Sequence, residues 1–109
     1  MNIRTYDRGL SLMIDTISLE NASMLFKALS DSTRLTIVYQ LTLKEMNVTS
    51  IAQALGMEQS TVSHQLKTLK AARLVKSRRE GKARIYSISD DHVQELINQV
   101  MSHVQEKRE

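Results

Sequence analysis

The spacing of apolar residues across residues 48–69 constrains the fold of this chain more than any other feature. The first part of this stretch places apolar side chains on one face of a short helix, and Gly56 stands where a helix ends in a left-handed residue. After a short turn, Val62, Leu66 and Leu69 recur at spacings of four and three, which is typical of the buried stripe of a second helix. Two helices joined by a tight glycine-containing turn predict a helix-turn-helix unit, whose second helix enters the DNA major groove.

The second helix of this unit carries hydrogen-bonding side chains on the faces that its apolar stripe leaves outward. Hydroxyl, amide and imidazole groups near the N-terminus of such a helix are suited to contact base edges and phosphates in the major groove. We therefore predict DNA contacts from Gln59, Ser60, Thr61, Ser63, His64 and Lys67.

The segment that follows predicts a basic β-hairpin, or wing. Residues 84–88 alternate polar and apolar side chains, and Gly81 in the preceding connector suits a tight turn. Between Ser60 and Arg84 the chain has eight basic residues and one acid, a net charge of +7, whereas the whole chain carries only +3. Such a confined basic patch indicates phosphate binding, although a solvated cationic face on an unrelated helical domain is the alternative. Contacts to the DNA backbone or minor groove are predicted for Arg78, Arg79, Lys82 and Arg84.

Three further segments have the apolar spacing of amphipathic helices, at residues 18–29, 31–41 and 90–109. The last of these begins at Asp90, a good N-cap, and its apolar stripe is wider than a small domain covers alone. It therefore predicts the seam of a homodimer, which two DNA half-sites also require. Packing of this stripe on the chain's own first helix is the alternative, and the two arrangements are compatible.

Together these elements predict a mainly α fold with a small β-hairpin, in the order α-α-α-α-β-β-α. We expect an N-terminal arm at residues 1–17 and one winged helix-turn-helix domain at residues 18–109, because 109 residues are enough for one small core.

The composition excludes several other classes of protein. The chain has no cysteine, which rules out disulfides, thiolate metal sites and a thiol redox switch. No run approaches the roughly 20 apolar residues that span a bilayer. The first residues mix acids and arginines and lack the apolar core of a signal peptide. We therefore expect a cytoplasmic protein that does not associate with membranes.

Two of the three histidines lie in the terminal helix, each beside a carboxylate, as Asp90-x-His92 and His103-x-x-Glu106. Asp90 and His103 are separated by about 20 Å of helix at the usual rise, so one helix cannot bring both pairs to one ion. Two such helices running antiparallel across a two-fold axis can do so, because the start of one then meets the end of the other. Each of the two resulting sites has two nitrogens and two carboxylates, which suits zinc in tetrahedral geometry, with cobalt as a substitute. The alternative is a hydrated polar face.

From about Leu19 onward the chain resembles the ArsR/SmtB family of metalloregulatory winged-helix repressors. The matching segments are 26–35 (FKALSDSTRL), 60–70 (STVSHQLKTLK), Leu74-Val75 and 84–88 (RIYSI). In the branch of this family that senses zinc through its C-terminal helices, an Asp-x-His pair is followed ten residues on by His-x-x-His or His-x-x-Glu. Asp90, His92, His103 and Glu106 match that pattern. The cysteines expected of the branch with a second kind of metal site are absent from residues 43–48.

The resemblance implies a zinc-responsive repressor that binds double-stranded operator DNA when metal-free and dissociates when zinc binds. It also implies that His103 reaches the backbone at the end of the recognition helix, at about Arg73. Two alternatives stay open: a regulator of the same fold whose metal site is vestigial, and a DNA-binding protein in which zinc is purely structural. An enzyme with a small-molecule substrate is not expected, because a four-ligand site leaves zinc no open position and a helix seam offers no cleft.

Overall fold

The computed structural model describes residues 15–106, so residues 1–14 of the predicted N-terminal arm lie outside the described part of the chain. The elements are α2 (Thr16–Leu29), α3 (Ser32–Leu43), β1 (Met46–Asn47), α4 (Val48–Leu55), α5 (Gln59–Ala71), β2 (Val75–Glu80), β3 (Ala83–Ile88) and α6 (Asp91–Gln105). Helix α2 therefore begins two residues earlier than the sequence predicts. The predicted winged helix-turn-helix is confirmed, with α4 and α5 as its two helices and β2–β3 as its wing.

Four helices begin at a residue whose side chain accepts a hydrogen bond from the first helical turn, which satisfies a backbone N–H that has no partner inside the helix. Asp15 accepts from the amide of Ser18, and this cap is the reason for the early start of α2. Asp31, Asn47 and Asp90 do the same for α3, α4 and α6. The starts of these helices are thus determined locally, within three residues of each cap.

The core lies where α3, α4, α5 and the base of the wing meet, and the first half of α6 closes it. Burial of each large aliphatic side chain contributes about 1.5–3 kcal/mol, so this cluster is the main source of stability. Its fully buried members are Ile37, Val38, Ile51, Val62, Leu66, Leu69, Leu74 and Ile97.

The sheet has three strands in the order β1-β3-β2, where the sequence predicts a two-stranded hairpin. Met46 pairs with Tyr86 and Asn47 with Ile85, which attaches the segment after α3 to the wing. A two-residue strand is too short to show any alternation, so the sequence pattern does not reveal it. In the hairpin itself, Gly81 has φ 62° at the first loop position, a conformation that suits a two-residue turn and that residues with a Cβ rarely adopt.

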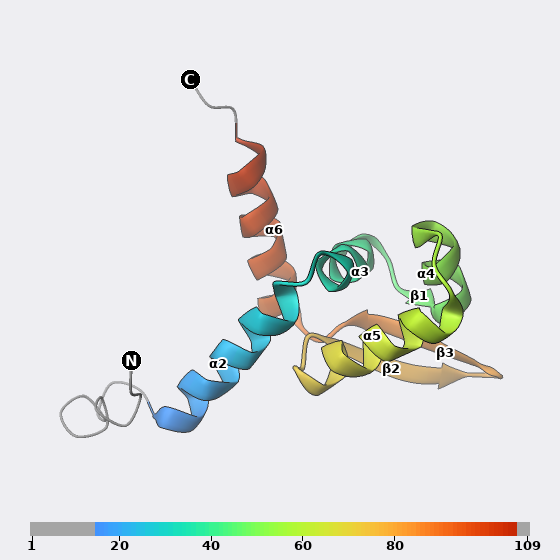
Figure 1. The fold of residues 1–109 in the computed structure, drawn as a ribbon, viewed down its shortest axis with the longest axis horizontal. Coiled ribbons are helices and arrows are strands. Elements are labelled where there is room, and N and C mark those ends of the chain that lie inside the picture. The colour runs from blue at the N-terminus through green and yellow to red at the C-terminus, as the bar shows by residue number, and fades with distance from the viewer. Residues whose placement is uncertain (1–14, 107–109) are drawn as a thin grey trace.

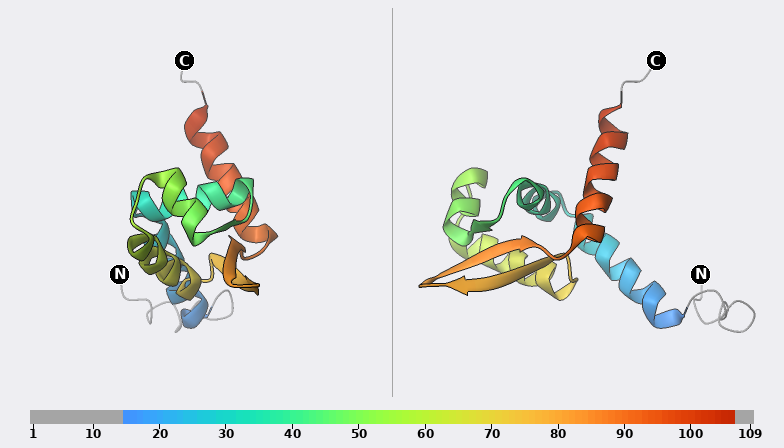
Figure 2. Two further views of the ribbon diagram at one scale, coloured as in Figure 1. Left: turned by 90° about the vertical axis from the view of Figure 1, so that its right-hand side faces the viewer. Right: turned by 180° about the vertical axis from the view of Figure 1, so that it is seen from behind.

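The helices lie in two regions of the domain, as Figure 1 and the view from behind in Figure 2 show. Helix α5 runs alongside the hairpin with α4 next to it, whereas α2 and α6 diverge from the other end of the domain. Between α2 and α6 lies an apolar groove lined by Phe26, Leu29, Ser30, Leu35, Leu96, Ile97 and Val100. Within residues 15–106, no helix is both long and apolar enough to cross a membrane.

Candidate functional site

The outward surface of α5 displays the side chains that the sequence predicts for DNA reading. Because Val62, Leu66 and Leu69 bury one stripe of the helix, the residues on its other faces point to solvent. The exposed set is Gln59, Ser60, Thr61, Ser63, His64 and Lys67, every predicted contact on this helix. Gln65 differs from them: it is half-buried, and its side-chain oxygen accepts a hydrogen bond of 3.2 Å from Arg34, which ties α5 to α3.

The end of α5 is closed by a tight double hydrogen bond. The amide of Leu74 donates to the carbonyl of Leu69 (3.0 Å) and the amide of Arg73 to that of Lys70 (3.0 Å), the pattern of a Schellman motif. The motif needs a left-handed residue, and Arg73 supplies it with φ 62°, where glycine is usual. Leu69 and Leu74 are both fully buried, so their packing compensates the cost of this conformation. Arg73 therefore holds a strained position at the junction of recognition helix and wing.

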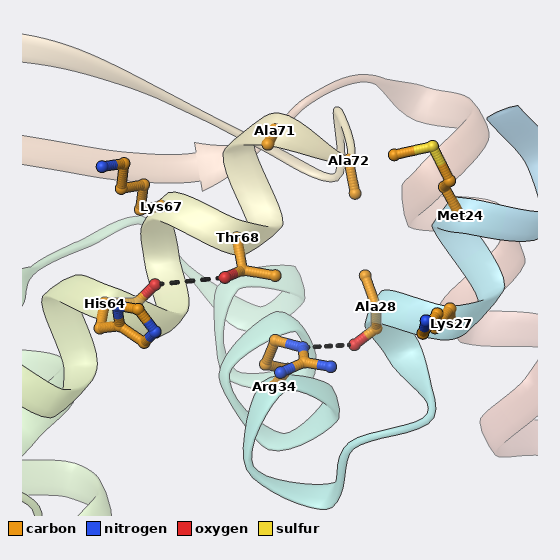
Figure 3. Close-up of a pocket in the computed structure, with 9 residues that line it drawn as sticks. All are labelled: Met24, Lys27, Ala28, Arg34, His64, Lys67, Thr68, Ala71 and Ala72. Atoms are coloured by element: carbon orange, nitrogen blue, oxygen red, sulfur yellow. Dashed lines mark hydrogen bonds between the residues drawn. The ribbon is translucent and has the colours of Figure 1, made fainter.

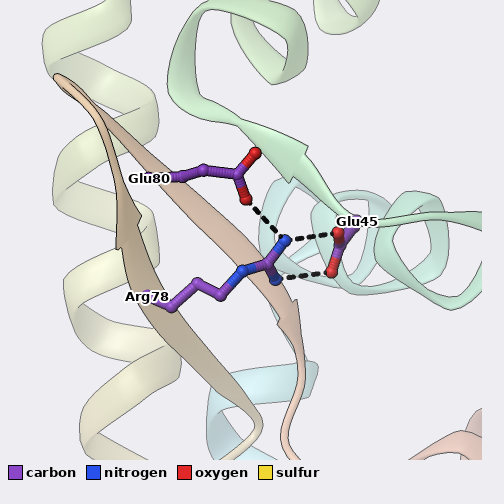
Figure 4. A network of polar contacts seen from close by, with 3 residues as sticks. All are labelled: Glu45, Arg78 and Glu80. Atoms are coloured by element: carbon purple, nitrogen blue, oxygen red, sulfur yellow. Dashed lines mark hydrogen bonds and ion pairs between the residues drawn. The ribbon is translucent and has the colours of Figure 1, made fainter.

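Arg78 is held by two carboxylates from different parts of the chain (Figure 4). Its two terminal nitrogens donate to the two oxygens of Glu45, each at 2.7 Å, and one of them also lies 3.0 Å from Glu80. These hydrogen bonds hold the pKa of Glu45 below its ordinary value and raise that of Arg78. Arg78 thus joins β2 to the segment between α3 and β1, and its charge is already balanced within the protein. Its predicted contact with DNA remains a prediction.

The other basic residues of the wing have different surroundings. Arg79 and Arg84 are paired directly across β2 and β3, an arrangement in which like charges repel. Arg84 and Lys70 both donate to the hydroxyl of Ser77, at 3.3 and 3.0 Å. Arg79, Lys82 and Arg84 are all exposed. The surface between α5 and the wing therefore concentrates positive charge.

The predicted metal ligands lie in two pairs at opposite ends of α6. Nδ1 of His92 is 3.6 Å from Asp90, and Nδ1 of His103 is 3.7 Å from Glu106. The two imidazoles are 95% and 84% exposed, so the domain does not use them in its own core. The backbone hydrogen bond from Val93 lowers the pKa of Asp90, and His92 adds to this effect, so the carboxylate is ionised and can act as a ligand.

Within residues 15–106 of a single chain, no three His, Asp or Glu side chains gather in a way that could hold a metal ion. Two imidazoles and two carboxylates are a suitable set of ligands for zinc. They can meet at one ion only if a second chain places the opposite end of its own α6 beside the first pair. His103 has no hydrogen bond to Arg73 among the interactions of the described residues, and its ring lies beside Glu106. The structure thus brings together the members of each pair and leaves the pairs apart.

Sequence reasoning missed two groups that shape this surface. The first is Glu45, which the sequence shows only as one residue of the cysteine-free segment 43–48, whereas its partner Arg78 lies 33 positions further on. Arg34 donates through Nε to the carbonyl of Ala28 (2.8 Å) and through Nη1 to Gln65, which links α2, α3 and α5. Nothing in the local sequence around Glu45 indicates Arg78 as its partner, and nothing around Arg34 indicates Gln65.

The chain is similar to known proteins over most of its length. Residues 31–77 match the family described as bacterial regulatory protein, arsR family. The chain is 40% identical over 95 residues to the transcriptional repressor SmtB homolog of Synechocystis, which covers 84% of this chain and 72% of that protein. It is 39% identical over 87 residues to the cadmium resistance transcriptional regulatory protein CadC homolog of Staphylococcus aureus, covering 79% of this chain and 72% of that protein.

Among solved structures, the chain is similar to the homodimeric winged helix-turn-helix DNA-binding domain of a possible ArsR-family transcriptional regulator from Mycobacterium bovis. The TM-score is 0.78 at 35% identity, and the match covers 81% of this chain and 82% of the other. The chain therefore belongs to the ArsR family of bacterial regulatory proteins, and it is a transcriptional regulator of the ArsR/SmtB type rather than an enzyme.

Proposed function

We propose that this protein is a homodimeric repressor that binds operator DNA when metal-free and releases it when zinc binds between the two terminal helices. The observation that carries the DNA-binding half is the exposed polar face of α5 beside a basic wing. The observation that carries the metal-sensing half is the pair of exposed His–carboxylate groups at the two ends of α6.

The exposed positive charges of the wing favour the binding of phosphate groups. Arg79 and Arg84 face each other across the hairpin, and the cost of placing like charges in register is removed when an anion lies between or beside them. Lys82 at the hairpin turn is exposed and extends the same charged surface. We propose that these three side chains contact the DNA backbone while the exposed side chains of α5 reach base edges.

The proposed dimer contact is the groove between α2 and α6. Phe26 is 59% exposed, Val104 65% and Val100 40%, and these large apolar side chains flank or extend the groove. A soluble domain rarely leaves such a continuous apolar strip in water, so a partner surface is expected there. A second copy supplies the same helices, and the homodimeric state of the M. bovis domain supports this choice.

The same dimer completes the proposed metal site. In an antiparallel arrangement of two α6 helices, Asp90 and His92 of one chain meet His103 and Glu106 of the other, which gives two equivalent sites. The bound ion would supply only charge and fixed coordination geometry there. The CadC homolog is named for cadmium resistance, but the present chain has no cysteine, and nitrogen and oxygen donors favour zinc or cobalt over softer ions.

We further propose that His103 couples this site to the recognition helix. A metal-bound imidazole usually donates its second N–H to a nearby acceptor, and the proposed acceptor is the carbonyl of Arg73. Arg73 is the strained left-handed residue of the α5 end motif, so a new hydrogen bond there acts on the helix–wing junction directly. Linkage then requires zinc and operator to weaken each other's binding by the same factor.

Titration of zinc into the protein–operator complex tests the proposal, with fluorescence anisotropy of a labelled operator as the readout. The proposal expects stepwise release of DNA at about two zinc ions per dimer. Binding of operator that ignores zinc would instead identify a regulator with a vestigial metal site. If sedimentation shows that zinc is needed for the dimer to form at all, the metal has a structural role.

A further inference from the structure

A pocket of about 530 Å³ lies between α2, α3 and α5, beside the DNA-reading face of the recognition helix (Figure 3). This volume falls in the range of sites that bind small organic molecules. The lining residues are Met24, Lys27, Ala28, Arg34, His64, Lys67, Thr68, Ala71 and Ala72. The predicted metal ligands are not among them.

The charged groups in this lining are all cationic, and none of the nine lining residues carries a carboxylate. Arg34 is the most informative, because it is half-buried and its two hydrogen bonds go to neutral acceptors, the carbonyl of Ala28 and the amide oxygen of Gln65. Within residues 15–106 its guanidinium has no ion pair with an acidic side chain. A partly desolvated guanidinium with nothing to balance its charge favours an anionic ligand.

The walls of the pocket are apolar, which narrows the class of anion. Met24 and Ala28 project from α2 on one side, and Thr68 and Ala71 of α5 lie on the other, together with Ala72 just after the end of α5 (Figure 3). A small inorganic anion would balance the positive charges of Lys27 and Arg34 but would leave the apolar side chains of the pocket in contact with water. An anion that carries a hydrocarbon body covers the walls and places its charge at Lys27 and Arg34.

This pocket is separate from the proposed dimer groove. Met24 and Phe26 are two positions apart on α2, which turns their side chains by about 200° around the helix axis. Met24 lines the basic pocket against α5, whereas Phe26 lines the groove against α6, which has no charged residue in its lining. The two faces of α2 therefore suit different occupants, an anionic ligand on one and an apolar protein surface on the other.

We propose that the pocket is an effector site for an organic monocarboxylate with a hydrocarbon body, and that its occupation opposes DNA binding without any metal. A bound ligand would oppose DNA binding because His64 and Lys67 belong both to the pocket lining and to the predicted DNA surface. A carboxylate held there lowers the positive potential that phosphates meet. This second part rests on the proposed DNA binding, whereas ligand binding itself does not.

Octanoate is the probe, with octanamide as its uncharged analogue and acetate as the anion without a hydrocarbon body. The test uses the 109-residue chain after its metal has been removed, and it follows backbone amide NMR shifts. Octanoate is expected to shift the amides of Ala28, Thr68 and Ala72, and to bind at least five-fold more tightly than either analogue. Lys27→Gln is expected to weaken octanoate at least five-fold, because it removes a cation that lies outside the predicted DNA and metal residues. Lys44→Gln is the matched control, since it removes an exposed lysine that does not line the pocket.

Equal binding of octanamide, or equal effects of Lys27→Gln and Lys44→Gln, would show that no anion site exists. Shifts centred on Phe26 and Val100 would place the probe in the dimer groove and also overturn the proposal. Saturating octanoate is expected to weaken operator binding at least five-fold, and operator must weaken octanoate equally. Octanoate that binds without changing operator affinity would refute the coupling. A protein that binds operator and responds to zinc, but not to octanoate, refutes only this pocket; failure to bind any operator refutes the proposed function instead.

Discussion

The guanidinium of Arg78 and the carboxylate of Glu45 are joined by two parallel hydrogen bonds of 2.7 Å, although the residues are 33 positions apart. This bidentate pair connects the wing to the segment in front of the helix-turn-helix (Figure 4). It also changes the expected role of Arg78, because a guanidinium already paired with a carboxylate has less charge to offer to DNA. We therefore expect the pair to hold the wing in position and to weaken the binding of phosphate to it.

Glu45→Gln should make DNA binding tighter and more dependent on salt. The substitution removes a negative charge beside the wing and leaves Glu80 as the one acidic partner of Arg78 among the described residues, so Arg78 can take up a phosphate and the slope of log affinity against log salt should steepen by about one unit. Anisotropy titrations at several salt concentrations measure this slope. Glu95→Gln, which removes an exposed acid from α6 instead, is the matched control and should leave it unchanged. A flatter slope for Glu45→Gln would mean that the pair mainly positions the wing.

The same pair should respond to acid with a definite sign. Hydrogen bonds from Arg78 lower the pKa of Glu45 from its ordinary value of 4.5, so the pair stabilises the fold above that value. This contribution is lost as the pH falls through the lowered pKa, when the carboxylate takes up a proton. Side-chain carboxyl NMR shifts of Glu45 should therefore titrate below pH 4.5, and in Arg78→Ala the midpoint should return toward 4.5. An unchanged midpoint in that variant would contradict the assignment.

Substitutions in the wing and in the recognition helix should affect DNA binding differently. Lys82→Ala should weaken binding to operator and random DNA alike and flatten the salt dependence by about one unit, because it removes a phosphate contact. Ser63→Ala and His64→Ala should instead reduce discrimination between operator and random DNA by about 1–3 kcal/mol for each lost base contact. Competition binding experiments with operator and with random DNA measure the affinity of each variant for both. Equal losses on both DNAs for the helix variants would contradict the division of roles.

Asp90→Asn should separate helix capping from metal binding. Asparagine caps helices about as well as aspartate, so the α-helical circular dichroism signal should not change. The amide is a much poorer ligand than a carboxylate, and we expect zinc affinity to fall by about ten-fold or more. Calorimetric zinc titration measures this loss. If the affinity of Asp90→Asn equals that of the parent, Asp90 is a cap and not a ligand.

His103→Glu should uncouple metal binding from DNA release. Glutamate can still ligate zinc but has no N–H to donate to Arg73, so the zinc-loaded variant should keep most of its operator affinity. In the parent, typical coupling energies of about 1–3 kcal/mol correspond to a 5- to 150-fold loss. Operator titrations with and without zinc measure the ratio, after metal analysis has shown that the variant is loaded. Parent-like release by the loaded variant would place the coupling in the dimer seam.

Arg73→Gly should stabilise the protein relative to Arg73→Ala. Both variants lose the same charge, but only glycine adopts φ 62° without steric cost, and that cost is about 1 kcal/mol for residues with a Cβ. Urea unfolding of the two variants gives the difference in free energy directly. Arg73→Val should be less stable than either, since a β-branched side chain tolerates this conformation least. Equal stability of all three would mean that the left-handed turn is not maintained in solution.

The features predicted correctly from the sequence are those determined within one or two helical turns. The spacing of Val62, Leu66 and Leu69 predicts the buried stripe of α5, because helical geometry alone brings those positions to one side. The predicted cap at Asp90 likewise acts on the amide of Val93, three residues away. The basic charge of the wing is a property of composition and requires no fold.

Other features depend on which distant segments pack together, and only the tertiary structure shows them. Met46 becomes a strand residue because the core brings it beside Tyr86, and two residues have no periodicity from which pairing can be predicted. Arg78 meets Glu45, and Arg34 reaches Gln65, for the same reason. These partners are 33 and 31 positions apart, and local physical chemistry does not select them. Packing of the shared core around Ile51 and Leu66 decides them, because it determines which surfaces approach each other.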